Sequence, residues 1–319
     1  MKLPLLYLLL FCLLLSCAKE QKKEAQGPLN TPAMKTQALL LVQDKAYDNE
    51  AKSVVSHDYS KLQSLIVPEN LAPQNKWIMF EGPVLENQQI AYRFYGDHRH
   101  RSDIYAKSVD KLVMDTVSWD YHKIQNWGSD VLKVGNSLGI GSPAIWYEDS
   151  LFSFSNYEDK EIKVDIAGGA SAKVSFIFKG LTFGEHSLDV IHEWEIRGKG
   201  FHTSNTIRIL DGELPEGAYF ASGIVKHLKD LHTDTQLDHF LAYTWGKQGF
   251  HKKNLGMAVM VENEYQPEQI PDPLSHAFIF KNAPKELTYY FLANWEPGNQ
   301  GAKNKEAFKE IILASLKEI

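Results

Sequence analysis

Cysteine is nearly absent from this 319-residue sequence. Cys12 and Cys17 are its two cysteines, and both lie close to the amino terminus. We expect Cys12 to be removed on export and Cys17 to carry a lipid, so that the folded part has no thiol and no disulfide. An exported domain without covalent cross-links depends on its apolar core. The hydrophobic content of 44% is sufficient for this, because a chain of roughly 300 residues buries about 75% of its unfolded surface.

The sequence also lacks an apolar run long enough to cross a bilayer as a helix. Residues 5–15 are apolar and follow Lys2, which is typical of a signal peptide. The letters LLSC at residues 14–17 resemble a bacterial lipobox, in which Cys17 is lipidated; a plain signal peptide is the alternative. We therefore predict a lipoprotein signal peptide at residues 1–17, a flexible Lys-, Glu- and Gln-rich tether at 18–35 and a single domain at 36–319.

This organisation predicts a protein of the periplasm, the outer membrane or the cell surface that touches the membrane only through a lipid at Cys17. A strongly basic charge is missing as well, since 34 Lys and Arg face 40 Asp and Glu, for a net charge of -6. The electrostatic footprint of a nucleic-acid-binding protein is thereby excluded. An anionic partner would need a local basic pocket.

Helix signals are few, whereas strand signals recur along the chain. Short segments rich in Val, Ile, Phe, Tyr and Thr end at turn residues, at 38–42, 61–67, 76–81, 89–95, 162–166, 172–178, 187–196, 206–210, 240–245, 256–262, 275–280 and 287–293. This spacing predicts an all-β fold, a large antiparallel β-sandwich or a barrel with few short helices. Asn304 is placed to cap an amphipathic carboxy-terminal helix at residues 305–317.

No motif predicts a metal or a cofactor. The glycines of residues 135–141 precede a segment with strand character at 142–147 instead of a helix, so we interpret them as tight turns with φ > 0 and not as a nucleotide loop. His186, His192 and His202 lie in a β-rich region, and His192 has no second histidine four residues later. A metal site there is a minor alternative, and we expect surface or cleft histidines.

Arg93 lies inside the apolar alternating segment 89–95. An unpaired guanidinium in such a place is costly, so Arg93 must meet a carboxylate. That carboxylate comes either from the protein, as with Glu81, Glu86 or Asp97, or from a ligand, and both options are open. The basic residues 98–101 that follow are expected to form a solvated turn.

Residues 121–133 combine side chains that suit a sugar. Asn126 can hydrogen-bond hydroxyl groups, Trp127 can stack on the apolar face of a pyranose, and Asp130 and Lys133 follow. His122 lies five residues before Trp127, and a satisfied buried histidine is the structural alternative for it. An aromatic face, an amide and an acid together indicate a glycan site.

Over this stretch the sequence resembles domain of unknown function family 4861. The matching motifs are Glu86-Asn87, residues 90–96, residues 103–105, Tyr121-His122, residues 127–135 and residues 137–141. The resemblance is dense from residue 81 to residue 146 and thinner to about residue 300. It implies an exported product of a Bacteroidota polysaccharide-utilisation cluster with a β-sandwich related to galactose-mutarotase-like and polysaccharide-lyase sandwiches. It also implies an oligosaccharide dehydratase, which removes water from the non-reducing-end uronic acid of ulvan fragments and leaves a 4,5-unsaturated sugar.

Such a dehydration is a β-elimination, so the site needs a cation on the uronate carboxylate and groups that exchange protons near neutral pH. We assign the cation to Arg93, with Lys133 second, and one proton-transfer role to His122. The other role falls to a tyrosine, Tyr95, Tyr121 or Tyr105. Glu81, Asn126 and Asp130 are expected to orient the cation or bind hydroxyls, with Trp127 as the stacking platform.

Three other readings use the same residues. A polysaccharide lyase would expel a sugar instead of water, and a glycoside hydrolase would need two carboxylates across the scissile bond, such as Glu81 and Asp130. A non-catalytic glycan-binding lipoprotein would carry the aromatic platform without clustered acid and base. The expected partner is an anionic oligosaccharide, with no cofactor.

Overall fold

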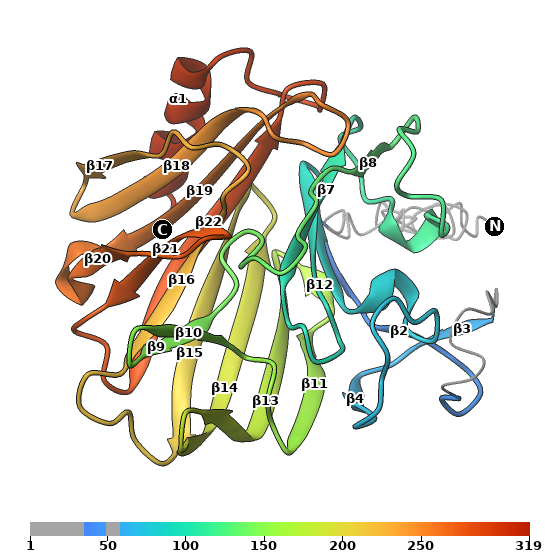
Figure 1. Ribbon diagram of the computed structural model, residues 1–319. Coiled ribbons are helices and arrows are strands. Elements are labelled where there is room, and N and C mark those ends of the chain that lie inside the picture. The colour runs from blue at the N-terminus through green and yellow to red at the C-terminus, as the bar shows by residue number, and fades with distance from the viewer. Residues whose placement is uncertain (1–34, 49–57) are drawn as a thin grey trace, which may run out of the picture. The chain divides into compact units, whose positions relative to one another are not determined.

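The computed structural model describes residues 35–48 and 58–319, and within them three large antiparallel sheets dominate (Figure 1). The six-stranded sheet runs in the order β12 (Gly168–Gly169), β1 (Thr36–Leu39), β5 (Val84–Asn87), β6 (Ile90–Phe94), β7 (Ser102–Lys107) and β8 (Gly128–Asp130). The nine-stranded sheet runs in the order β17 (His232–Gln236), β18 (His239–Lys247), β19 (Asn254–Glu262), β22 (Glu286–Trp295), β15 (His202–Asp211), β14 (His186–Arg197), β13 (Ser171–Phe183), β11 (Asp159–Ile166) and β4 (Ser64–Ile66). The five-stranded sheet runs in the order β10 (Ser150–Ser153), β9 (Ala144–Tyr147), β16 (Tyr219–Val225), β21 (Ser275–Phe280) and β20 (Pro267–Ile270), and β2 (Leu41–Gln43) pairs with β3 (Tyr59–Lys61).

The main core lies between the nine-stranded sheet and the two smaller sheets. Alternate residues of each strand point into it, because side chains on a strand alternate between faces. Phe94 of β6 contacts Trp194 of β14 and Phe291 of β22, and all three side chains are fully buried. The predicted all-β antiparallel sandwich is confirmed. The predicted signal peptide with Cys17 and nearly all of the predicted tether lie outside the described residues.

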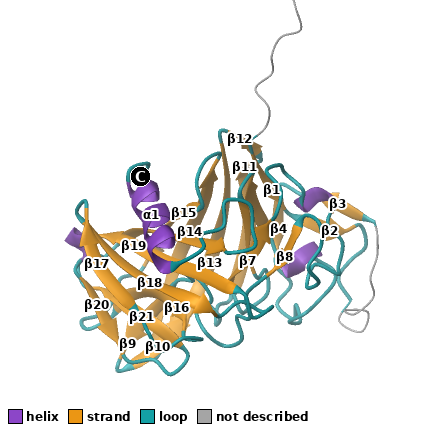
Figure 2. Cartoon of the chain, turned by 90° about the horizontal axis from the view of Figure 1, so that it is seen from above, coloured by secondary structure: helices purple, strands orange, loops and turns teal. Residues whose placement is uncertain are grey.

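The predicted carboxy-terminal helix is confirmed as α1 (Lys305–Leu316). The Asn304 side chain accepts a hydrogen bond from the backbone N–H of Ala307, as an N-cap does. Phe308 packs its ring on Trp245 of β18, so the helix covers part of the nine-stranded sheet (Figure 2). Among the described residues, no helix has the length and apolarity that a membrane crossing requires.

Two local predictions are wrong. Residues 76–81 form no strand; Ile78 makes one bridge to Val42, and Met79–Glu81 is a 3-10 helix. The backbone leaves the extended conformation there, with φ of 62° at both Phe80 and Glu81, and Phe80 packs in the apolar cluster over the six-stranded sheet. Residues 98–101 are not a solvated turn, because His100 is fully buried and its Nε2 lies 3.1 Å from Nδ1 of His192.

His192 is fully buried and not a surface or cleft residue, whereas His202, 2% exposed, lines a hollow of about 140 Å³ and His186 is partly exposed. His192 and His202 both belong to long strands of the nine-stranded sheet, His192 on the face toward the core. Neighbouring rings enclose His100 and His192, among them Phe94 and Phe176. Within the described residues, no group of three or more potential ligands is arranged to hold a metal ion.

Gly128 begins β8, the edge strand of the six-stranded sheet, with φ of 136°. A Cβ at this position would lie 1.9 Å from the carbonyl oxygen of Ala106 on β7. We expect Gly128→Ala to lower the free energy of unfolding by about 1–3 kcal/mol through forced separation of β7 and β8, measured by chemical denaturation.

The matched control for Gly128→Ala is Gly135→Ala. Gly135 also has a positive φ, of 58°, but a Cβ there meets nothing within 4 Å. Gly135→Ala should lower the free energy of unfolding only by the cost of a left-handed backbone conformation in a residue with a side chain, about 1–2 kcal/mol or less. Equal losses in the two variants would show that the close approach of β8 to β7 adds nothing to the backbone strain.

Candidate active site

The outer face of the six-stranded sheet carries the residues that the sequence singled out. Tyr92 and Phe94 of β6 point into the main core, so Arg93 points to the opposite face, and Asp103 of β7 lies across from it in register. The segments 79–81 and 113–121 cover this face with a second apolar cluster that includes Phe80 and Tyr121. A layer of irregular chain therefore encloses polar groups that a solvated sheet face would leave exposed.

Arg93 is the centre of a buried ionic network, with 1% of its side chain exposed. Its guanidinium donates to Asp103 Oδ2 at 2.6 Å, to the Phe80 carbonyl at 2.8 Å, to Tyr95 Oη at 3.0 Å, to Tyr121 Oη at 3.2 Å and to Asp130 Oδ2 at 3.4 Å, and Glu81 Oε1 lies 3.7 Å away. The carboxylate partners of Arg93 thus come from the protein. Nε of Arg93 is buried without a hydrogen-bond partner, and the burial of the whole guanidinium among protein carboxylates does not support the expectation that it holds the carboxylate of a substrate.

Of the three carboxylates named from the sequence, only Glu81 lies within 4 Å of Arg93. Glu86 pairs instead with Lys107 at 2.6 Å, and Asp97 pairs with Arg99 at 2.6 Å. Arg99 also reaches Glu81 at 2.6 Å and lies 3.7 Å above the ring of Tyr95. Asp103 was missed, although its place opposite Arg93 on the next strand follows once the β6–β7 hairpin is known.

The three tyrosines are placed as structural members of the network. Tyr95, Tyr105 and Tyr121 are 8%, 0% and 1% exposed, and burial raises the pKa of each above its ordinary value. A phenol with a raised pKa is a poor base, and these hydroxyls do not face solvent. The expectation that one of them exchanges a proton with substrate is not supported by this placement.

His122 is brought to the edge of the same network. Its Nδ1 lies 3.2 Å from Asp130 Oδ2; the His122 side chain is 55% exposed and the Asp130 side chain 3% exposed. The hydrogen bond and charge of Asp130 raise the pKa of His122 above its ordinary value of 6.5, against a smaller effect of burial. With Nδ1 on the carboxylate, Nε2 is the ring nitrogen left to exchange protons with a ligand.

The pKa of His122 provides a direct test. We expect Asp130→Asn to return the pKa of His122 toward 6.5. NMR titration of the imidazole signals measures this pKa in both proteins. Because the folded pKa is raised, the stability from this pair is present below the unfolded pKa and lost as pH rises through the folded pKa. A His122 signal that titrates identically in both proteins would contradict the assigned contact; His98, which is also exposed, is the internal reference.

The charge count of the network agrees with the raised pKa of His122. The network contains four carboxylates, Glu81, Asp97, Asp103 and Asp130, and two guanidinium groups, those of Arg93 and Arg99. Burial, together with the charge of Asp130, raises the pKa of Asp103 to about 6. An excess of negative charge in a buried place favours bound protons, and the exposed imidazole is the group best placed to carry one.

Two neighbours of His122 were missed from the sequence. Phe250 lies in the turn between β18 and β19, is 52% exposed, and its ring centroid is 6.2 Å from that of His122. The backbone N–H of Phe250 donates to the Val131 carbonyl at 2.6 Å, which fixes the turn beside β8. These contacts join residues about 120 positions apart, and no local pattern signals them.

His251 is a partly buried member of the site. Its Nε2 lies 2.8 Å from Ser129 Oγ, and that hydroxyl is 3.1 Å from the carbonyl of Tyr121. When the single proton of Ser129 goes to the carbonyl, the hydroxyl accepts from Nε2–H of His251. This tautomer leaves Nδ1 of His251 as the ring nitrogen without a proton, and the ring centroid of His251 is 5.1 Å from that of Phe250.

A hollow of about 470 Å³, which none of His122, Phe250 and His251 lines, contains two of the predicted sugar-binding residues. Asn126 and Trp127 line it with Lys111 and Gln125, and the Trp127 ring centroid is 6.4 Å from that of Tyr105. The indole N–H of Trp127 is buried without a hydrogen-bond partner. Lys133 is exposed. The structure thus brings Asn126 and Trp127 together at an open surface.

The fold and the site define a β-sandwich protein whose outer sheet face holds a buried ionic network that ends in an exposed imidazole. The chain belongs to the family described as Domain of unknown function (DUF4861), which it matches over residues 12–319. No curated protein matches the sequence.

Among solved structures, two of the α-N-acetylgalactosaminidase NagBb from Bifidobacterium bifidum are similar to the chain. The complex with GalNAc has 11% identity and a TM-score of 0.33, and the match covers 72% of this chain and 37% of that one. A quadruple mutant has 12% identity and a TM-score of 0.34, over 72% and 38% of the two chains. The chain thus spans less than half the length of these enzymes, and at such scores we infer no shared activity or site.

Proposed function

We propose that the protein is a carbohydrate-active carbon–oxygen lyase. It removes water from the non-reducing-end uronic acid of ulvan-type oligosaccharides and leaves a 4,5-unsaturated uronate, the activity that the family resemblance implies. The observation that carries the proposal is the pairing of the exposed His122 with the buried Asp130. An imidazole held by a carboxylate beside an open surface is suited to proton transfer near neutral pH.

The elimination divides between the exposed His122 and the partly buried His251. Nδ1 of His251 takes the C5 proton, the C5–H electron pair forms the C4–C5 double bond, and the C4–O bond breaks. Nε2–H of the His122 imidazolium gives its proton to the departing hydroxyl, which leaves as water. Asp130 raises the pKa of His122, which favours the protonated form that carries the proton to be donated, and Nδ1 of His251 is the ring nitrogen that accepts the C5 proton.

Loss of the C5 proton also requires a cation at the uronate carboxylate, because that charge otherwise opposes the developing carbanion. Since Arg93 is committed to Asp103 and Asp130, we assign this contact to the exposed Lys133. Arg93 becomes a positioning residue that holds Asp130 under His122. Trp127 and Asn126 bind the next sugar in the hollow that they line.

The placement of the carboxylates does not favour a glycoside hydrolase. Glu81 and Asp130 are 8% and 2% exposed, and both are engaged by Arg93. A hydrolase needs one carboxylic acid and one carboxylate on the two sides of a bound glycosidic bond. A purely binding protein would not need an imidazole whose pKa is raised by a buried acid.

The test is incubation of the protein with ulvan and pectin oligosaccharides, followed by mass spectrometry and ultraviolet absorbance. We expect a product lighter by one water, of unchanged chain length, that absorbs at the new double bond. Shorter unsaturated products would instead identify a polysaccharide lyase, and shorter saturated products a hydrolase. Binding without any change of mass would identify a glycan-binding protein and overturn the proposal.

We also propose that the protein acts outside the cytoplasm, anchored by a lipid on Cys17. The support is the LLSC sequence at residues 14–17 after an apolar run. Metabolic labelling with a fatty-acid analogue should mark the wild type and not Cys17→Ser. Labelling of both proteins would reject the anchor without affecting the proposed chemistry.

A further inference from the structure

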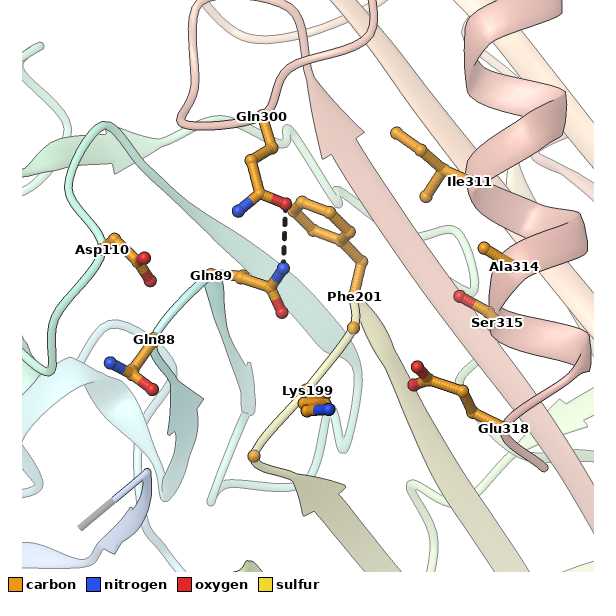
Figure 3. A pocket seen from close by; sticks show the side chains of 12 residues that line it. Gln88, Gln89, Asp110, Lys199, Phe201, Gln300, Ile311, Ala314, Ser315 and Glu318 are labelled. Carbon is orange, nitrogen blue, oxygen red and sulfur yellow. Dashed lines mark hydrogen bonds between the residues drawn. The ribbon is translucent and has the colours of Figure 1, made fainter. Parts of the chain in front are cut away.

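A second hollow, of about 390 Å³, lies at one end of the sandwich and shares none of its lining residues with the site at His122 (Figure 3). Gln88 and Gln89 reach it from the turn between β5 and β6, and Phe201 from the turn between β14 and β15. Gln300 precedes α1, and the last turns of α1 supply Ala314. Four segments far apart in the sequence thus converge on a space within the size range of ligand sites, roughly 300–1,000 Å³.

The lining of this hollow is apolar on one side and rich in amides on the other. Phe201, Ile311 and Ala314 are its apolar residues, and Figure 3 shows the Phe201 ring beside Gln89 and Gln300, with Ile311 and Ala314 of α1 across from these amides. Each amide offers both a donor and an acceptor. A pyranose ring presents the complementary pattern, an apolar C–H face with hydroxyls around its edge.

One polar atom in the hollow lacks a partner. Gln89 Nε2 donates to Gln300 Oε1 at 3.0 Å, whereas Gln89 Oε1 is buried and accepts no hydrogen bond. Figure 3 shows this oxygen directed away from Gln300. An unmet buried acceptor costs about 1–3 kcal/mol. Because this oxygen is buried, a ligand hydroxyl satisfies it only when the Gln89 side chain turns toward the hollow.

The charges in the lining select against an acidic ligand. Asp110 and Glu318 contribute two carboxylates, and Lys199 contributes one cation. A uronate or a sulfated sugar would bring a further negative charge to this set, which costs free energy. An uncharged sugar keeps the hydroxyl contacts without that cost.

We infer that this hollow binds an uncharged pyranose residue of a glycan, independently of the chemistry at His122. The contacts are a hydroxyl hydrogen bond to Gln89 Oε1, further bonds to the amides of Gln88 and Gln300, and packing of the C–H face on Phe201. The site would hold a neutral sugar of a polysaccharide while the acidic end is processed elsewhere.

The experiment is titration of the protein with methyl β-D-xylopyranoside, methyl α-L-rhamnopyranoside and methyl β-D-glucopyranoside, with methyl β-D-glucuronide as the acidic comparator, followed by NMR. Ala314→Trp places a large ring on an exposed helix position that lines the hollow, and it should weaken the neutral glycosides at least tenfold. Gln89→Ala should weaken them about three- to tenfold, the loss of a single hydrogen bond. Glu306→Trp, on the exposed first turn of α1, is the matched control and should bind like the wild type.

Three results would overturn the inference: no neutral glycoside binds, Ala314→Trp binds as tightly as Glu306→Trp, or the glucuronide binds more tightly than every neutral glycoside and loses that binding in Ala314→Trp. Because the neutral glycosides carry no uronate, their binding does not depend on the proposed lyase activity. His122→Ala should retain the binding, which separates failure of this site from failure of the other.

Discussion

Replacing His122 with alanine should lower kcat for the loss of water by roughly 100- to 10,000-fold, the range that a positioned acid or base contributes. The substitution removes the only exposed titratable group that contacts Asp130 among the described residues. The free energy of unfolding should change little, because the side chain is 55% exposed and Asp130 keeps its contact with Arg93. The measurement is the rate of appearance of the unsaturated uronate, with chemical denaturation in parallel.

Two further variants test whether the loss of kcat is specific to the imidazole of His122. His98→Ala removes an equally accessible imidazole outside the site and should retain wild-type kcat. Asp130→Asn should lower kcat less than His122→Ala and shift the pH profile to lower pH, because the pKa of His122 falls when the carboxylate charge is lost. If His122→Ala kept near wild-type activity, the assignment of His122 would be abandoned.

Local signals predicted the fold well. Residues 275–280 were predicted as a strand with the bounds that β21 has, and Asn304 caps the helix that its position indicated. These features depend on alternation and capping, which act over a few residues. The strand prediction for residues 76–81 was wrong because this segment is buried by packing over a sheet. Such tertiary packing overrides the local alternation of side chains.

The site was predicted only in part, because its contacts depend on tertiary structure and not on local signals. Arg93 was recognised as needing a carboxylate, but the choice of Asp103 depends on strand register, and the place of His251 depends on a turn that packs beside β8. The burial of Tyr121 likewise follows from the covering segment and not from its neighbours in sequence. Residue types therefore indicated a polar cluster, whereas its division into buried and exposed halves required the fold.

The largest expected effect on stability comes from Arg93→Met, which should lower the free energy of unfolding by about 3–5 kcal/mol. Methionine fills much of the same volume but leaves Asp103 and Asp130 buried without their shared cation. Uncompensated charge in a buried place costs more than the lost pair itself contributes. Chemical denaturation at neutral pH measures the loss.

The matched control is Arg208→Met. Arg208 makes two ion pairs, with Glu193 and Glu286, but its side chain is 43% exposed, so the loss should be at most about 1 kcal/mol. Adding Asp103→Asn to Arg93→Met should recover part of the stability, because one uncompensated charge disappears. Equal losses for Arg93→Met and Arg208→Met would show that the network is solvated and not buried.

The stability that Arg93→Met loses should depend on pH, and this dependence tests whether uncompensated buried charge causes the loss. Asp103 already has a pKa of about 6 in the wild type, raised by burial, and loss of the cation should raise it further. A carboxyl whose folded pKa exceeds its unfolded pKa contributes stability that is present at low pH and is lost as pH rises through the folded value. The deficit should therefore be smaller at about pH 5 than at about pH 8. A deficit that stays constant with pH would assign the loss to packing, and the same carboxylates would then no longer explain why His122 binds its proton tightly.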